Sequence, residues 1–197
     1  MPKISESRRE ERRSDIMQAA LRCFLRAGYQ QTSMADIIAE SGLSAGAIYS
    51  YFPSKQALIR GVATQVLGER RAVVEAATAE HPLSPSEIVT LLINGVRAHA
   101  PAQAIVQVWS EATVDSDLRA HIQGMIGDMR GTITGALTRW GAAHPEALPA
   151  GQAPASWAAA TSATLIGLLP GFMLQRALVG DFDEEGYLLG IRLLLRD

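Results

Sequence analysis

Residues 32–58 read TSMADIIAESGLSAGAIYSYFPSKQAL and contain two short helices separated by a turn. Ser33, with Asp36 three residues later, fits a capping box, so a helix is predicted to begin near Met34. Gly42 ends that helix, because glycine readily adopts the left-handed conformation that follows a helix C-terminus. The first helix of the pair therefore has a defined start and a defined end.

A second short helix follows the turn. Ser44 is a favourable N-cap, and the helix is predicted to run from Ala45 to about Tyr51. Pro53 ends it, and Ser54 caps the helix that comes next. Two helices at this spacing are typical of a helix-turn-helix, whose second helix lies in the major groove of DNA.

The side chains expected on the outer surface of this unit suit contact with DNA. The front of the second helix carries only small side chains, so its backbone can approach base edges closely: Ala45, Gly46, Ala47 and Ser50. Tyr49 has a hydroxyl that can reach a phosphate oxygen. Lys55 lies in the first turn of its helix, where the macrodipole disfavours a cation, and a phosphate partner would explain that placement. The alternative, that Tyr49 and Phe52 are core aromatics and Lys55 is solvated, stays open for each residue alone but is less favoured for the whole set.

Residues 32–58 resemble the DNA-binding module of the tetracycline-repressor (TetR) family of transcriptional regulators. The strongest matches are Gly42-Leu43-Ser44, Ile48-Tyr49, Tyr51-Phe52 and Pro53-Ser54-Lys55 with Leu58. The resemblance implies a DNA-facing surface, which with the N-cap of the second helix consists of Ser33, Met34, Ser44, Ala45, Gly46, Ala47, Tyr49, Ser50 and Lys55. Because the front of the second helix has no long polar side chain, shape and backbone contacts are expected to carry more of the specificity than direct base readout.

Composition favours an all-α fold. Of the 197 residues, 48% are hydrophobic and only 6% are aromatic, so the core must be built mainly from Ala, Leu, Ile and Val. No run of alternating β-branched and polar residues extends over six positions. The expected architecture is an N-terminal three-helix helix-turn-helix domain over residues 8–70, followed by a C-terminal helical ligand-binding and dimerisation domain over residues 71–197.

Charge is distributed unevenly along the chain. The net charge is −2, but residues 1–60 hold nine Lys or Arg against six Asp or Glu, a net charge of +3, and the remainder carries −5. A phosphate-binding surface is expected in the basic part. Arg8, Arg9, Arg12 and Arg13 open the first helix. They could meet phosphates or the minor groove, or they could form a solvated face balanced by neighbouring glutamates, and both interpretations stay open.

The first helix is predicted over residues 8–27, with apolar positions at helical spacing: Ile16, Ala20, Cys23, Phe24 and Ala27. Because Cys23 is the single cysteine, an intramolecular disulfide is excluded. The charged N-terminus lacks the apolar segment of a secretion signal. Both features favour a reducing cytoplasm.

Enzymatic chemistry has no support in the sequence. The four histidines are scattered, and no HExxH motif, cysteine pair or Gly-rich loop after a strand is present. Asp117 and His121 share a helix face and could hold a metal, but a surface ion pair is the favoured interpretation. No cofactor is expected, and a small helical metal-binding protein remains only an alternative.

The second half of the chain predicts further amphipathic helices, including a long one over residues 115–143. Residues 157–174 carry no charge and nominally reach the length of a membrane span. Polar residues and Pro170 interrupt this run, so a soluble helix buried on nearly all sides is favoured over a membrane anchor, which remains the alternative. Such burial requires a partner, and a symmetric homodimer is predicted through residues 155–179 and 183–195.

The family resemblance also implies a small-molecule pocket among the helices of residues 86–180. The candidate lining residues are Trp109, Glu111, Met125, Met129, Trp140, Phe172 and Met173. The alternative, that the apolar members are plain core, has equal weight, and a carboxylate near an aromatic ring would favour a cationic ligand. The function expected from the sequence is a homodimeric repressor that binds a pseudo-palindromic operator and is released by a small molecule.

Overall fold

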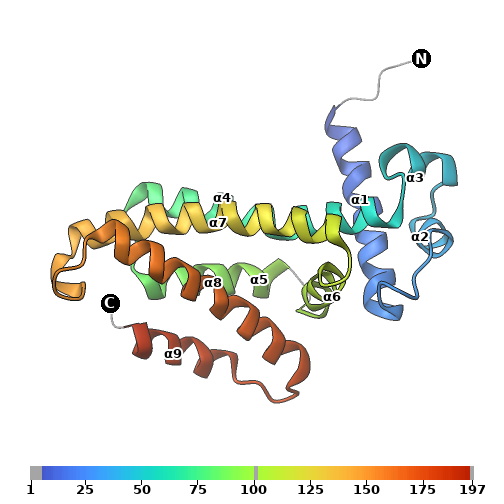
Figure 1. Cartoon of the computed structure of the whole chain (residues 1–197). Coiled ribbons are helices and arrows are strands. Elements are labelled where there is room, and N and C mark those ends of the chain that lie inside the picture. Colours follow the sequence, from blue (N-terminus) through green and yellow to red (C-terminus); the bar gives the residue numbers. More distant parts are fainter. Residues whose placement is uncertain (1–5, 100–101, 196–197) are drawn as a thin grey trace. The chain divides into compact units, whose positions relative to one another are not determined.

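The computed structural model describes residues 6–99 and 102–195, without the side chains of residues 66–70 and 98–99. The described residues form α-helices joined by short connections, with no strand among them (Figure 1). The all-α prediction is confirmed. The helices are α1 (Glu6–Ala27), α2 (Met34–Ser41), α3 (Ala45–Tyr51), α4 (Lys55–Glu80), α5 (Pro85–His99), α6 (Ala102–Ala112), α7 (Ser116–Ala143), the short 3-10 helix η1 (Pro145–Ala147), α8 (Pro154–Leu178) and α9 (Glu184–Leu195).

The chain divides into two compact units. The first unit contains residues up to 65 together with 107–121, and the second contains residues 66–106 and 122–197. Two side-chain contacts connect residues 107–121 to the rest of the first unit. The Gln30 amide donates to the Glu111 carboxylate at 2.6 Å, and Thr64 Oγ1 lies 2.8 Å from His121 Nε2.

The core of the first unit is built from α1, α2, α3 and the start of α4. Ile16, Ile37 and Ile48 are fully buried, one from each of the first three helices. Gly61 on α4 permits close packing, because an added Cβ would lie 2.9 Å from Phe52 Cε1. The apolar face predicted for the first helix is confirmed except at its end, where Ala27 is exposed.

In the second unit α5 contacts both α8 and α9, and these two helices contact each other. Helix α8 is long and apolar enough to cross a membrane by length and composition, but only 28% of its most apolar 18-residue window is buried. The prediction of burial on nearly all sides is therefore not met within one protomer. The apolar face of the amphipathic helix predicted over residues 115–143 is also only partly buried, since Ile133 is fully buried while Ile126 is 42% exposed.

Candidate nucleic-acid interface

Local capping defines α2 as predicted. The Ser33 hydroxyl accepts a hydrogen bond from the Asp36 N–H at 3.2 Å, and the Asp36 carboxylate accepts one from the Ser33 N–H at 2.8 Å. These hydrogen bonds from Ser33 lower the pKa of Asp36. Gly42 follows α2 with a φ of 67°, in the left-handed region. The first helix of the pair is thus fixed at both ends by its own sequence.

One face of helix α3 packs against the core, and the opposite face is exposed. Ser44 accepts the N–H of Ala47 at 3.3 Å as the N-cap, while Ile48 is fully buried and anchors the helix to the core. The predicted DNA-facing residues lie on the other side, where Ala45, Gly46, Tyr49 and Ser50 are exposed and Ala47 is half-buried. The exposed face of α3 therefore offers small side chains and one tyrosine, which is 49% exposed.

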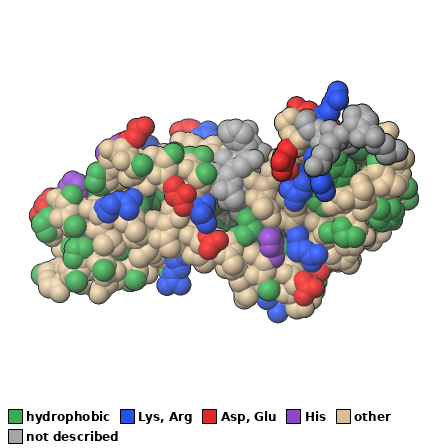
Figure 2. Space-filling model, turned by 90° about the horizontal axis from the view of Figure 1, so that it is seen from above, with side chains coloured by type: hydrophobic (Ala, Val, Ile, Leu, Met, Phe, Trp, Pro, Cys, Tyr) green, Lys and Arg blue, Asp and Glu red, His purple; other side chains and the backbone are tan. Residues whose placement is uncertain are grey.

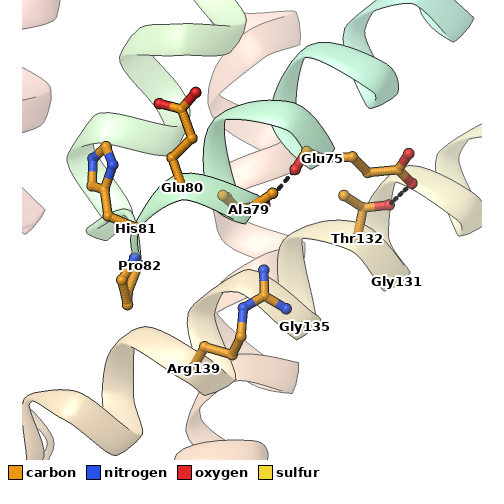
Figure 3. Close-up of a pocket in the computed structure, with 10 residues that line it drawn as sticks. Glu75, Ala79, Glu80, His81, Pro82, Gly131, Thr132, Gly135 and Arg139 are labelled. Atoms are coloured by element: carbon orange, nitrogen blue, oxygen red, sulfur yellow. Dashed lines mark hydrogen bonds between the residues drawn. The ribbon is translucent and has the colours of Figure 1, made fainter.

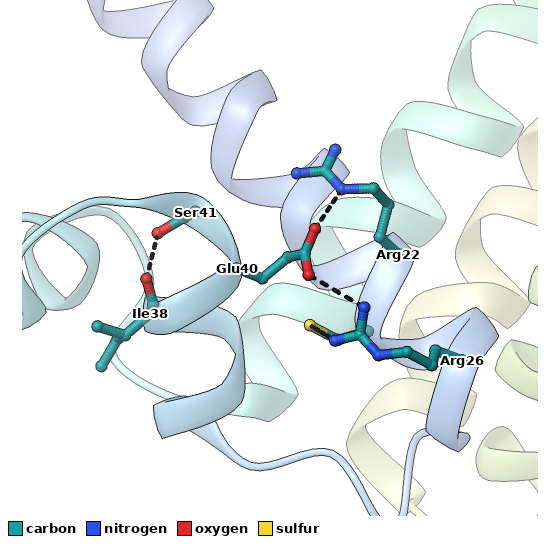
Figure 4. A network of polar contacts seen from close by, with 6 residues as sticks. Arg22, Arg26, Ile38, Glu40 and Ser41 are labelled. Carbon is teal, nitrogen blue, oxygen red and sulfur yellow. Dashed lines mark hydrogen bonds and ion pairs between the residues drawn. The ribbon is translucent and has the colours of Figure 1, made fainter.

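An ion-pair network joins α1 to α2 (Figure 4). The two oxygens of Glu40 on α2 lie 2.7 Å from Arg22 Nε and 3.0 Å from Arg26 Nη1, both on α1. Hydrogen bonds from the two arginines lower the pKa of Glu40. The network crosses from one helix to the other and so fixes the distance between them.

The arginines at the start of α1 pack on aromatic rings, an arrangement that the sequence did not predict. The guanidinium of Arg9 lies 5.9 Å from the centre of the Tyr51 ring, and that of Arg13 lies 5.4 Å from the centre of the Phe52 ring. Arg13 also forms an ion pair with Glu10 at 3.4 Å. On the face drawn in Figure 2, basic and acidic side chains are interspersed rather than gathered into one basic patch.

Lys55 has partners within the protein. Its ammonium donates hydrogen bonds to the backbone carbonyls of Tyr29 at 2.8 Å, Gln30 at 3.3 Å and Thr32 at 2.8 Å. The sequence suggested a phosphate as the reason for a cation at the start of a helix. The three carbonyls also favour a cation at this position, and the phosphate contact stays a prediction.

The seven predicted ligand residues differ in burial and in hydrogen-bond partners. Trp109 and Glu111 belong to the first unit, and the other five belong to the second. The Glu111 carboxylate is bonded to Gln30. Three of the others are core residues, as the alternative interpretation held: Trp140, which stacks on Trp157 at 5.6 Å, and Phe172 and Met173, which are fully buried. The remaining two of these five, Met125 and Met129, are half-buried.

A groove of the second unit has a different lining (Figure 3). It has a volume of about 640 Å³ and lies between the C-terminal end of α4 and the middle of α7, with the lining residues Glu75, Thr78, Ala79, Glu80, His81, Pro82, Gly131, Thr132, Gly135 and Arg139. Thr132 donates to Glu75 at 3.2 Å within it. Sequence reasoning missed this groove because it sought polarisable apolar side chains, whereas most of the lining consists of glycines and of polar or charged residues.

No group of three or more His, Cys, Asp or Glu side chains that could hold a metal ion occurs among the described residues. His121, one half of the metal pair weighed from the sequence, lies beside Thr64.

The fold and its exposed α3 can be compared with known proteins. The family model for bacterial regulatory proteins of the tetR family matches residues 16–62. The HTH-type transcriptional regulator YfiR of Bacillus subtilis is 33% identical over 109 residues, which cover 54% of this chain and 53% of YfiR. The chain thus spans about half the length of this curated relative.

Solved structures share the fold of the whole chain. A transcriptional regulator from Aquifex aeolicus superposes with a TM-score of 0.73 at 18% identity, covering 93% of this chain and 97% of that one. A transcriptional regulator from Saccharomonospora viridis, solved in complex with choline, gives a TM-score of 0.69 at 19% identity and covers 94% and 95% of the two chains. With the capped helix pair that the family model matches, these findings show that residues 16–62 are similar to the tetR family of bacterial regulatory proteins, in a chain that shares the fold of solved transcriptional regulators.

Proposed function

We propose that the protein is a cytoplasmic transcriptional repressor that binds a pseudo-palindromic operator as a homodimer and is released by a small molecule. The observation that carries the proposal is the exposed face of α3, capped by Ser44 and anchored by Ile48. A helix with small side chains in front can enter a major groove deeply, and hydroxyl groups at its edge can bond to phosphates. The proposed DNA-facing residues are Ser33, Met34, Ser44, Ala45, Gly46, Ala47, Tyr49, Ser50 and Lys55.

Exposed leucines on α8 and α9 support the homodimer. Leu174 and Leu178 on α8 are 47% and 73% exposed, and Leu189, Leu193 and Leu194 on α9 are 51%, 68% and 82% exposed. The two helices contact each other, and large apolar side chains exposed on neighbouring helices are typical of a surface that a protein partner covers. Pairing the two helices with their copies across a two-fold axis would cover it as a four-helix bundle.

The same leucines could instead face lipid, as the membrane-anchor alternative requires. Helix α9 carries much of the exposed surface but has only 12 residues, too few to span a bilayer. The two helices also meet at an ion pair, with Arg176 Nε 2.9 Å from Glu184 Oε1. An apolar surface shared between a long and a short helix favours a protein partner over a bilayer.

We propose that a ligand bound to the second unit releases the protein from DNA. The Saccharomonospora viridis relative was solved with choline, which supports a small-molecule effector here without identifying it. Half-buried Met125 and Met129, and the groove between α4 and α7, are the candidate contacts. The dimer would exist in two geometries, of which only one places both α3 helices at the spacing of the operator. A ligand that binds more tightly to the other geometry would shift the equilibrium toward it and so release the DNA.

Selection of bound DNA from a random pool tests the proposal. The enriched sequences are expected to be pseudo-palindromic, with half-sites about 34–36 Å apart, one turn of the duplex. A reporter gene placed behind the selected sequence should be less active when the protein is present. No enrichment over the starting pool at low salt would refute DNA binding, and increased reporter activity would refute repression.

A further inference from the structure

The groove between the end of α4 and the middle of α7 is hollow because small residues line it. Gly131 and Gly135 contribute no side chain from α7, and Ala79 contributes only a methyl group from α4. A Cβ added at Gly131 meets nothing within 4 Å, so open space begins at the backbone of α7. The volume of about 640 Å³ lies within the range of small-molecule sites.

Arg139 brings a positive charge into this groove. Its side chain points from α7 toward the end of α4 (Figure 3), and its Nη1 would lie 3.8 Å from a Cβ added at Gly135. Within the part of the chain that the structure describes, the Arg139 side chain has neither an ion pair nor a hydrogen bond. A guanidinium presents a planar set of N–H donors that matches a carboxylate, so this end of the groove suits a carboxylate of a ligand.

Glu75 brings a negative charge into the same groove. Its Oε1 accepts a hydrogen bond from Thr132 Oγ1 at 3.2 Å and lies 3.0 Å from Arg71 Nε. Arg71 is shared with a second carboxylate, since its Nη1 lies 3.5 Å from Asp128 Oδ2. Two carboxylates with one guanidinium leave one net negative charge. A carboxylate can accept about four hydrogen bonds, so Glu75 can accept further ones from an ammonium of a ligand.

The two charges lie close to each other along α7 without forming an ion pair. The Glu75 carboxylate is held at Thr132, and the Arg139 guanidinium lies beside Gly135. Thr132 and Gly135 are three residues apart, which is about 4.5 Å along a helix. A molecule that carries an ammonium and a carboxylate at about this separation would meet both groups of the protein at once.

We infer that this groove binds a short zwitterion, with its ammonium at Glu75 and its carboxylate at Arg139. The inference rests on the proposed function, since such a molecule would be the effector that releases the protein from DNA. The probe is 4-aminobutanoate, whose extended chain separates its two charged groups by about the required distance. Butanoate and butylammonium each carry one of the two charges and serve as comparison probes.

An NMR titration of the protein without DNA tests the site. We expect 4-aminobutanoate to cause saturable shifts of the backbone amides of residues 131–139. The dissociation constants of butanoate and butylammonium should be at least about tenfold higher, because each lacks one charge-assisted contact. No saturable shift with 4-aminobutanoate, or equally tight binding of either comparison probe, would overturn the inference.

Removal of each charge in the groove gives the second measurement. Arg139→Gln and Glu75→Gln keep polar side chains of similar length, and each should raise the dissociation constant of 4-aminobutanoate at least about tenfold. Arg130→Gln is the matched control, because it removes an exposed cation from α7 outside the groove lining. Equal weakening in Arg130→Gln and Arg139→Gln, or unchanged binding in Arg139→Gln, would overturn the inference.

Filling the groove gives the third measurement. Gly131→Leu places a side chain in the hollow, whereas Gly127→Leu places one on α7 outside the lining, and an added Cβ meets nothing within 4 Å at either position. Leucine is favoured over glycine in a helix, so both variants should fold. Only Gly131→Leu should lose the saturable shifts, and full binding in that variant would overturn the inference.

Operator binding is measured separately from the titration. In the original protein 4-aminobutanoate should weaken binding to the selected operator, and in Arg139→Gln it should have at least about tenfold less effect at the same concentration. Because the titration needs no DNA, a protein that bound 4-aminobutanoate in the groove and kept its operator would refute release by this ligand, while the site itself still stood.

Discussion

The side-chain amide of Gln30 donates a hydrogen bond of 2.6 Å to the Glu111 carboxylate. Gln30 follows α1, and Glu111 lies near the end of α6, 81 residues later. The neighbouring Tyr29 is only 6% exposed, and burial, with the charges of Glu111 and Asp115, raises its pKa to about 12. The end of α6 therefore contributes both contact and charge to the loop that leads into the helix-turn-helix.

The high pKa of Tyr29 predicts a dependence of stability on alkaline pH. Its folded-state pKa of about 12 exceeds the ordinary value of 10.0, so its contribution to stability is complete below about pH 10 and is lost as the pH rises through 12. A tyrosinate absorbance titration should contain a component near pH 12 that is missing in Tyr29→Phe. Glu111→Gln should move that component to lower pH. If the titration of Tyr29→Phe still contained the component near pH 12, that component would not belong to Tyr29.

The Glu40 bridge predicts a dependence on acidic pH. Because the folded-state pKa of Glu40 is lowered, its carboxylate stabilises the fold above the unfolded-state pKa, and this contribution is lost as the pH falls through the folded-state pKa. Glu40→Gln should lower the melting temperature at pH 7, and the difference should shrink in acid. Glu10→Gln is the control, since the Glu10 side chain is 69% exposed and such ion pairs contribute little. Equal losses in both variants would contradict a specific role for Glu40.

Substitution of the exposed leucines tests the homodimer. Leu178→Glu with Leu193→Glu should give a mass of 21.1 kDa, where the unchanged protein gives twice that value by analytical ultracentrifugation. Burying a leucine contributes about 1.5–3 kcal/mol, so losing two on each protomer should raise the dissociation constant at least about 100-fold. Val114→Glu is the control, because Val114 is 73% exposed but belongs to the first unit.

Two results would contradict the dimer. The first is a monomeric mass for the unchanged protein, and the second is dissociation by Val114→Glu to the same extent as by the leucine substitutions. Partition of the unchanged protein into detergent would support the membrane alternative, since α8 meets the length and composition of a span.

Sequence reasoning succeeded where the structure is set by neighbouring residues. The ends of α2 and α3 depend on caps at Ser33, Gly42 and Ser44, whose partners lie within three residues, and these ends were predicted. The roles of Lys55 and Glu111 depend on partners 23 to 81 residues away, and spacing carries no information about them. The ligand pocket stays a prediction, because residue type alone does not distinguish a core side chain from one that lines a cavity.

Gly46 offers the sharpest test of the α3 surface, because stability and DNA binding should change in opposite directions. A Cβ added at Gly46 meets nothing within 4 Å, and alanine is favoured over glycine in a helix by up to about 1 kcal/mol, so Gly46→Ala should raise the melting temperature. Its methyl group would occupy the space through which α3 approaches the base edges, so operator affinity should fall. Gly124→Ala on α7 is the matched control, since its Cβ also meets nothing within 4 Å, and it should be stabilised without loss of affinity. Full operator affinity in Gly46→Ala would mean that the front of α3 does not lie against DNA.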